Sequence, residues 1–213
     1  MRKPLRLLLG SGILAAVLLG AAVPAQATDT VVLSAGHVDV VDLAYEDGVL
    51  EIGVHDETVE RAVDDVVFLV KNAAKTTVPA DPSFGFLGVA GKPVWVLPEI
   101  PNEELLWPGI ATEEIESGVF AADTVTLRFE KVTGAGRVAV FTENAVGAPN
   151  VLVNSGDGLP DALPLATGTH QHASWAFQKA GVYLIKVRAT AKLAATGQTV
   201  TSEPAVYKFV VQP

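Results

Sequence analysis

The chain has 213 residues, no cysteine and a formal net charge of −9. The absence of cysteine excludes disulfides, thiolate metal sites and lipid attachment at an N-terminal cysteine. The acidic balance leaves no electrostatic footprint for nucleic acid or anionic lipid, and it is compatible with binding cations.

The first 27 residues have the three parts of a secretion signal. Three basic residues precede an apolar stretch from Leu7 to Val23, and Ala25-Gln26-Ala27 supplies the A-x-A site of a signal peptidase. A retained membrane anchor is the alternative, and Pro24 with the cleavage site argues against it. We therefore expect residues 1–27 to be removed. The mature chain, residues 28–213, then carries a net charge of −12, since the signal holds three positive and no negative charges.

Valine, threonine, glycine and frequent turn signals make the mature chain typical of β-structure. Alternating apolar residues predict strands at Val38–Tyr45 and Val49–His55, joined by a tight turn at Glu46-Asp47-Gly48. A strand of the buried type is predicted at Val66–Lys71. No later segment has the roughly 20 unbroken apolar residues of a membrane-spanning helix.

Residues 79–118 differ in composition because they hold six prolines. Since proline is excluded from central strands, we expect a long packed excursion from the sheets. Within it we predict one short strand at Val94–Leu97 and a helical turn near Asn102–Leu106. Trp95 and Trp107 either line a ligand cleft or pack the excursion, and packing is the preferred interpretation.

Alternation returns in the second half of the chain. The many short strands and the lack of a long amphipathic helix predict an all-β fold, an immunoglobulin-like β-sandwich forming one domain over residues 28–213. Residues 163–168 are interpreted as a loop. The further predicted strands are Thr124–Val132, Arg137–Thr142, Ala173–Phe177, and a closing hairpin of Val182–Lys192 with Val206–Val211 around Gly197.

The placement of the histidines is the most informative feature for function. His170 and His172 are two residues apart, as are His37 and Asp39, and residues two apart in a strand point to the same side. If the two pairs lie on neighbouring strands, they offer three nitrogens and one carboxylate oxygen. That set suits a divalent metal, zinc above all, and suits copper(I) poorly.

Other interpretations stay open for these residues. The histidines could instead lie on the surface or order loops, and Asp39 could orient a histidine rather than bind the metal. For His55, near a strand end beside Asp56, a solvated polar face is preferred. Trp175 and Phe177 are predicted to pack in the core, and the acidic run 113–116 is predicted to be a solvated face.

Signatures of common enzymes are missing. Residues 85–92 are rich in glycine but lack the spacing of a phosphate-binding loop, and neither G-x-S-x-G nor H-E-x-x-H occurs. A cupin-type enzyme would add a glutamate shortly after H-x-H and a later histidine, yet no histidine follows His172. We therefore expect no catalytic residues, while a metal-dependent enzyme remains an alternative.

Motifs spread over residues 31–211 resemble one family. It is the actinobacterial surface-anchored repeat domain, also described as the choice-of-anchor M or ABC-transporter-associated repeat protein family. The motifs are Leu33-Ser34-Ala35-Gly36-His37-Val38-Asp39, Tyr45-Glu46-Asp47-Gly48, Phe86-Leu87-Gly88, Val94-Trp95-Val96-Leu97-Pro98, Leu106-Trp107-Pro108-Gly109, Gly168-Thr169-His170-Gln171-His172-Ala173-Ser174-Trp175-Ala176-Phe177 and Gly181-Val182-Tyr183.

The resemblance implies a place outside the membrane and an association with ABC importers of the metal-uptake type. It carries over His37, Asp39, His170 and His172, and not His55. The chain departs from the family in showing no wall anchor. The leading hypothesis is a secreted accessory protein that binds zinc and scavenges it or relays it to an importer's substrate-binding protein or another cell-surface component. The alternative is a cell-surface or wall-interaction module without metal.

Overall fold

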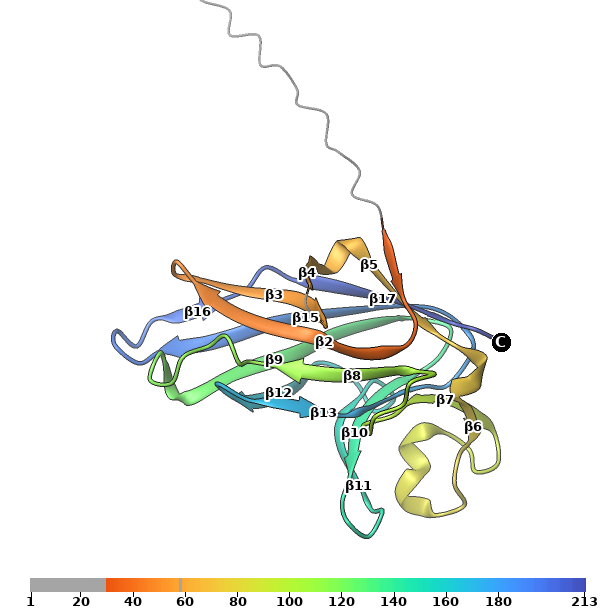
Figure 1. Ribbon diagram of the computed structural model, residues 1–213. Helices are drawn as coiled ribbons and strands as arrows, with labels where there is room; N and C mark the ends of the chain where they lie inside the picture. The colour runs from red at the N-terminus through yellow and green to blue at the C-terminus, as the bar shows by residue number, and fades with distance from the viewer. Residues whose placement is uncertain (1–29, 58) are drawn as a thin grey trace, which may run out of the picture.

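The computed structural model describes residues 30–57 and 59–213, so the predicted signal, residues 1–27, lies outside the described part. The described chain is all-β, as predicted. Its strands form three sheets (Figure 1). The helical segments among the described residues are short 3-10 turns, η1 (Val63–Asp65), η2 (Asn72–Ala74) and η3 (Pro82–Leu87). None of them is long or apolar enough to cross a membrane.

The largest sheet carries the closing hairpin. Its order is β1-β5-β17-β15-β9-β12, with β16 added beside β15. The predicted hairpin is present as β15 against β17, while residues 163–166, expected in a loop, belong to β12 and pair with β9. The strands are β1 (Val31–Leu33), β5 (Val66–Val70), β9 (Phe120–Gly134), β12 (Asp161–Ala166), β15 (Gly181–Leu193), β16 (Thr199–Thr201) and β17 (Ala205–Val211).

A second sheet carries all the histidines. Its order is β13-β8-β2-β3-β4, with β2 parallel to β8 and antiparallel to β3. The predicted turn between β2 and β3 has Asp47 at φ 47° and Gly48 at φ 84°. Positive φ at both central residues is what a two-residue hairpin turn requires. The strands are β2 (Gly36–Glu46), β3 (Val49–Asp56), β4 (Val59–Ala62), β8 (Leu106–Ala111) and β13 (His170–His172).

The third sheet receives the proline-rich excursion. Its order is β11-β10-β14-β7-β6, where β6 is Lys75–Thr77, β7 is Pro93–Leu97, β10 is Val138–Glu143, β11 is Pro149–Asn154 and β14 is Ser174–Phe177. The excursion packs on this sheet through a small apolar cluster that includes Val78, Leu87 and Phe141, with Phe84 partly buried against it. The predicted strand at 94–97 is present as β7.

One expectation for the excursion was wrong, because residues 106–111 form β8, an inner strand of the second sheet. Pro108 lies within it, although proline cannot donate to a ladder. The predicted helical turn at 102–106 is also absent. Asn102 Oδ1 instead accepts hydrogen bonds from the backbone N–H groups of Glu104 and Leu105, at 2.9 and 3.2 Å, and the chain then enters β8. An Asx turn of this kind competes with helix formation.

The three sheets share one apolar core. Trp175 packs on Phe129 and Phe209, and Phe177 packs on Phe209 and Tyr183, with all of these side chains fully buried. The core positions predicted for Trp175 and Phe177 are confirmed. Trp95 is also buried, which confirms packing for that residue. The consequence for function is that β2 and β8 present one face to this core and keep the other for polar side chains.

Candidate metal centre

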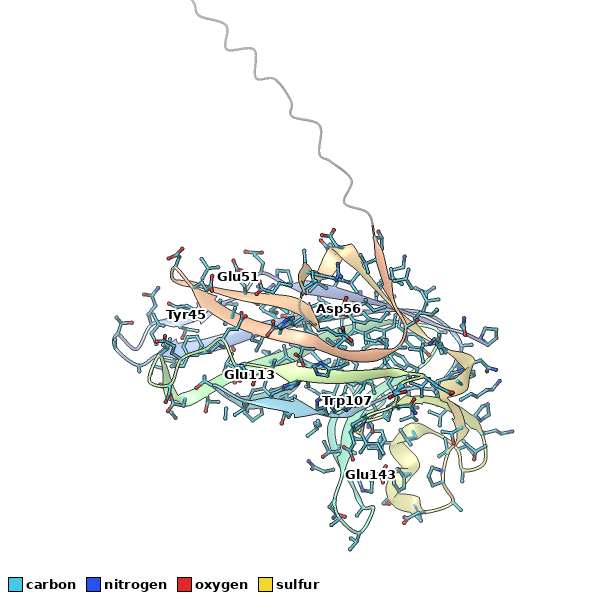
Figure 2. The ribbon with its side chains drawn as sticks, in the orientation of Figure 1. Tyr45, Glu51, Asp56, Trp107, Glu113 and Glu143 are labelled. Atoms are coloured by element: carbon cyan, nitrogen blue, oxygen red, sulfur yellow. The ribbon has the colours of Figure 1, made fainter. Side chains whose placement is uncertain are left out.

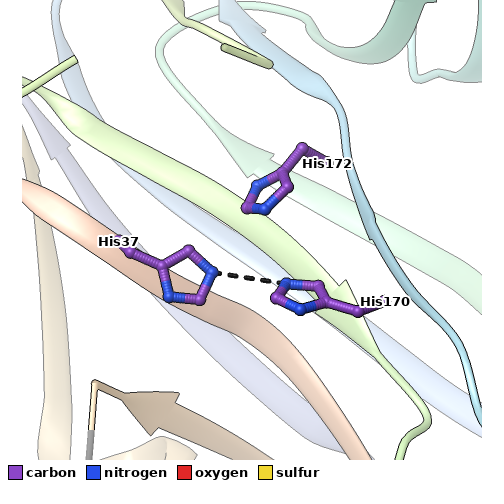
Figure 3. A group of neighbouring side chains, drawn as sticks. All are labelled: His37, His170 and His172. Carbon is purple, nitrogen blue, oxygen red and sulfur yellow. Dashed lines mark hydrogen bonds between the residues drawn. The ribbon is translucent and has the colours of Figure 1, made fainter. Parts of the chain in front are cut away.

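The two histidine pairs come together across an intervening strand. We expected neighbouring strands, but β8 runs between β2 and β13 (Figure 3). His37 lies opposite Trp107 and Asp39 opposite Gly109 on one side of β8, while His172 lies opposite Gly109 on the other side. Strands next but one to each other are roughly 10 Å apart. Long side chains leaning inward from both can therefore meet above β8.

Three imidazoles converge at this point. His37 Nε2 lies 3.3 Å from His170 Nε2. One ring nitrogen each from His37, His170 and His172 lies within 4.8 Å of the other two, so the cluster could hold a metal ion. The ring centroids are 4.8 to 5.1 Å apart. We call these three residues the histidine cluster.

Asp39 adds a carboxylate to the histidine cluster. Its Oδ1 lies 2.7 Å from His170 Nε2 and 3.5 Å from His37 Nε2. Asp39 is only 4 % exposed, and among the described residues Oδ1 has no partner with hydrogen-bond geometry, the close approach of His170 included. A buried carboxylate oxygen without a hydrogen bond is costly, unless a cation binds there.

These separations resemble the edges of a small coordination polyhedron. Four ligands about 2.0–2.1 Å from a tetrahedral ion are about 3.3 Å from one another. The contacts among His37, His170 and Asp39 are 3.3, 3.5 and 2.7 Å. A ring proton or a bound cation between these nitrogen and oxygen atoms makes such short contacts favourable. The three histidines could therefore hold a metal ion, with the Asp39 carboxylate beside two of them.

Gly109 makes room for this arrangement. A Cβ built on Gly109 would overlap Asp39 Oδ1 and would lie 2.8 Å from His170 Nε2. The φ of Gly109 is not in the left-handed region, so backbone conformation does not require glycine here. Glycine is needed instead because its lack of a side chain leaves space above β8 for the Asp39 carboxylate and the His170 ring. No sequence pattern identified Gly109, because its role depends on β8 running beneath the histidines.

Two of the three histidines have a polar group beside their second ring nitrogen. His172 Nδ1 lies 3.1 Å from the Pro108 carbonyl oxygen, which can only accept, so Nδ1 donates and Nε2 keeps a free lone pair. His170 Nδ1 lies 3.5 Å from Glu113 Oε2. Metal-binding histidines in general use the second nitrogen in this way, which fixes the ring orientation. Glu113, Glu114 and Glu116 are all exposed, as predicted for a solvated face, and Glu113 in addition lies beside His170.

Trp107 forms an aromatic wall for the cluster. Its ring stacks on His172 with centroids 3.9 Å apart and an angle of 12°, and it meets His37 edge-on at 5.0 Å. Trp107 Nε1 donates to the Glu99 carbonyl oxygen at 2.9 Å. Trp107 on β8 and Glu113 just after that strand lie along the same stretch of sheet (Figure 2). Burial lowers the pKa of His172, which favours the neutral ring that a metal needs.

His55 lies outside the histidine cluster. It faces Asp39 across the β2–β3 pair, and its Nδ1 is 4.0 Å from Asp42 Oδ2. The sequence favoured a solvated polar face for His55, and its side chain is half-buried, 35 % exposed, beside Asp42. Trp107, predicted to pack the excursion, contacts both the excursion and the cluster. The contact of Trp107 with the histidine cluster could not be predicted from the sequence, because it also depends on β8 running beneath the histidines.

No protein-family model matches the chain, and no curated protein matches it either. The function proposed below therefore depends on the geometry of the site and on the sequence.

Proposed function

We propose that this protein binds one divalent metal ion, zinc, through His37, His170 and His172, with Asp39 as the fourth ligand. The observation that carries the proposal is the buried Asp39 Oδ1, which lies without a hydrogen bond beside two imidazole nitrogens over the bare Cα of Gly109. A cation bound among these donor atoms stabilises the buried carboxylate.

The donor types support zinc. Three imidazoles and one carboxylate are acceptable to zinc, whereas calcium and magnesium prefer oxygen ligands. Copper(I) prefers thiolate and thioether ligands, and the chain has no cysteine and only the initiator methionine. Four protein donors fill a tetrahedral shell and leave no open position for substrate, which counts against the metal-dependent enzyme.

The exposure of the ligands supports an exchangeable ion. The side chains of His37 and His170 are each 27 % exposed, so solvent and a partner can reach the ion. The core of the protein packs without contribution from the cluster. A metal carried as cargo fits these facts better than a metal that holds the fold together.

The wider role rests on the sequence. The signal-like N-terminus and the family resemblance support an exported accessory protein that scavenges zinc or relays it to an ABC importer. The single apolar core shared by the three sheets supports the immunoglobulin-like sandwich as the finer description of the fold. The alternative, an adhesion or wall-interaction module, would be favoured if His37 lay more than about 10 Å from His170, since zinc ligands converge within roughly 2 Å of the ion. Their nitrogens are 3.3 Å apart.

Zinc titration by isothermal calorimetry tests the proposal. The purified protein should bind one zinc ion tightly, and the double variant His170→Ala, His172→Ala should lose that binding. His55→Ala is the matched control, because it removes an imidazole from the same sheet outside the cluster. Absence of binding by the unaltered protein, or equal loss in the His55 variant, would refute the metal assignment.

A further inference from the structure

A second polar region lies next to the histidine cluster. A groove of about 590 Å³ runs along β2, β3 and β4 and is bordered by the segment that enters β17. This volume lies within the range of small-molecule sites, about 300–1,000 Å³. The groove is far larger than a metal ion requires.

Nearly all of the charged side chains that line the groove are negative. Its single guanidinium, Arg61, is engaged by Asp56 at 2.9 Å, so it does not neutralise the lining. A cleft lined by one sign of charge attracts ions of the opposite sign. Six carboxylates line it, namely Asp42, Glu51, Glu60, Asp64, Glu114 and Glu203.

Asp42 is the informative member of this set. A β-bulge in β2 shifts the register between Asp39 and Asp42, and both Val40 and Val41 lie in the core. The extra residue therefore returns Asp42 to the polar face, although it is three positions from Asp39. Asp42 is 7 % exposed and lines the groove.

The Asp42 carboxylate lacks a close partner. Among the described residues it makes no hydrogen bond, and the nearest group that can carry positive charge, His55 Nδ1, is 4.0 Å from Oδ2. Burial first, and then Glu114 and Asp39, raise its pKa to about 6. A buried carboxylate among like charges is stabilised by a cation that enters from the groove.

We propose that this groove binds a small organic cation, an alkylammonium whose charged end contacts Asp42 and whose chain lies along the apolar part of the lining. Ala44, Ala62 and Pro204 are among the residues that form that apolar part. A bare metal ion fits less well, because the group of convergent metal ligands found in the described chain is the histidine cluster, not these carboxylates. The proposal is independent of the metal assignment.

Titration with 1,5-diaminopentane, followed by ¹H–¹⁵N NMR spectra of the full protein at pH 7.5 with EDTA, tests this site. Saturable shifts are expected at the amides of Gly53, Ala62 and Ala205, which line the groove. The neutral analogue 1,5-pentanediol should cause none. Asp42→Asn should weaken diamine binding by about tenfold or more, the size of effect that a lost charge-assisted contact produces.

Two further variants separate the possible causes. Glu103→Gln removes one exposed negative charge outside the groove and should leave the affinity within about twofold, as expected for a screened surface charge. His170→Ala with His172→Ala should also bind the diamine normally, even though it no longer binds zinc. Absence of saturable shifts, equal response to the diol, or equal weakening in the Glu103 and Asp42 variants would overturn the proposal. The spectra themselves report whether each variant is folded.

Discussion

At the scale of single residues, the candidate metal centre depends on what is absent at Gly109. Asp39 and His170 occupy the space where a side chain on Gly109 would stand. They approach each other from strands on opposite sides of β8, so neither can retreat without losing the convergence. The smallest side chain should therefore be enough to disturb the site.

Gly109→Ala should lower zinc affinity by on the order of a hundredfold, because its Cβ overlaps Asp39 Oδ1 and displaces the carboxylate from His170. Calorimetric titration measures the change. Gly85→Ala is the control, since a Cβ at Gly85 meets nothing within 4 Å and its φ is not in the left-handed region. Unchanged zinc binding in the Gly109 variant would exclude Asp39 and His170 from the coordination shell.

Asp42 provides a prediction about pH. Its pKa is about 6 in the folded protein and 3.8 in the reference state, because burial and the neighbouring Glu114, Asp39 and Glu60 disfavour the charge more than His55 favours it. The folded state then binds this proton more tightly than the unfolded state. The contribution of Asp42 to stability consequently falls as pH rises from about 4 to about 6.

The variant Asp42→Asn removes this titration. At pH 7 the variant should be more stable than the parent by about 3 kcal/mol, the equivalent of about two pKa units, and the difference should vanish below about pH 4. Urea denaturation with EDTA across this pH range measures it. If the difference in unfolding free energy between parent and variant did not change with pH, burial would not be raising the pKa of Asp42.

At the scale of strands, the alternation of apolar and polar residues predicts which side chains share one face of a strand. It does not predict which strands lie next to each other in a sheet. The period of two put His170 with His172 and His37 with Asp39, and the structure keeps each pair on one side. It could not show that β8 separates them, because Pro108 made that segment resemble a loop. The parallel pairing of β2 with β8 joins residues about 70 positions apart, and local periodicity carries no information about such contacts.

The strand β13 is three residues long and, in the described chain, pairs only with β8. Such a short edge strand opens readily. Zinc bound by His170 and His172 on β13 and by His37 on β2 would tie this edge to the inner strands. Zinc should therefore slow amide exchange in residues 169–172 and 109–112, measured by hydrogen exchange and mass spectrometry. The hairpin end of β15 and β16 serves as the internal reference, and an equal change there would argue against a local tie.

At the scale of the whole molecule, the protein is an acidic all-β structure with its histidines on one sheet and its aromatic core elsewhere. Composition and the alternation of apolar residues together predicted the all-β fold class, because turn signals and β-branched residues are distributed along residues 28–213. The division of the strands into three sheets could not be predicted in the same way. Gly134-Ala135-Gly136, for example, leads from β9 in the first sheet to β10 in the third rather than closing a hairpin.

The core and the histidine cluster are separate, so metal should stabilise the molecule without being needed for folding. A ligand that binds only the folded state at a hundred times its Kd adds about 2.7 kcal/mol. For a chain of this size that corresponds to a rise in Tm of about 5–10 °C. Calorimetric melting with EDTA and then with zinc measures the rise, and His170→Ala with His172→Ala should abolish it while melting cooperatively in EDTA. A protein that unfolds completely in EDTA would show a structural ion instead of an exchangeable cargo, because the fold would then depend on the four ligands rather than on the packing around Trp175 and Phe209.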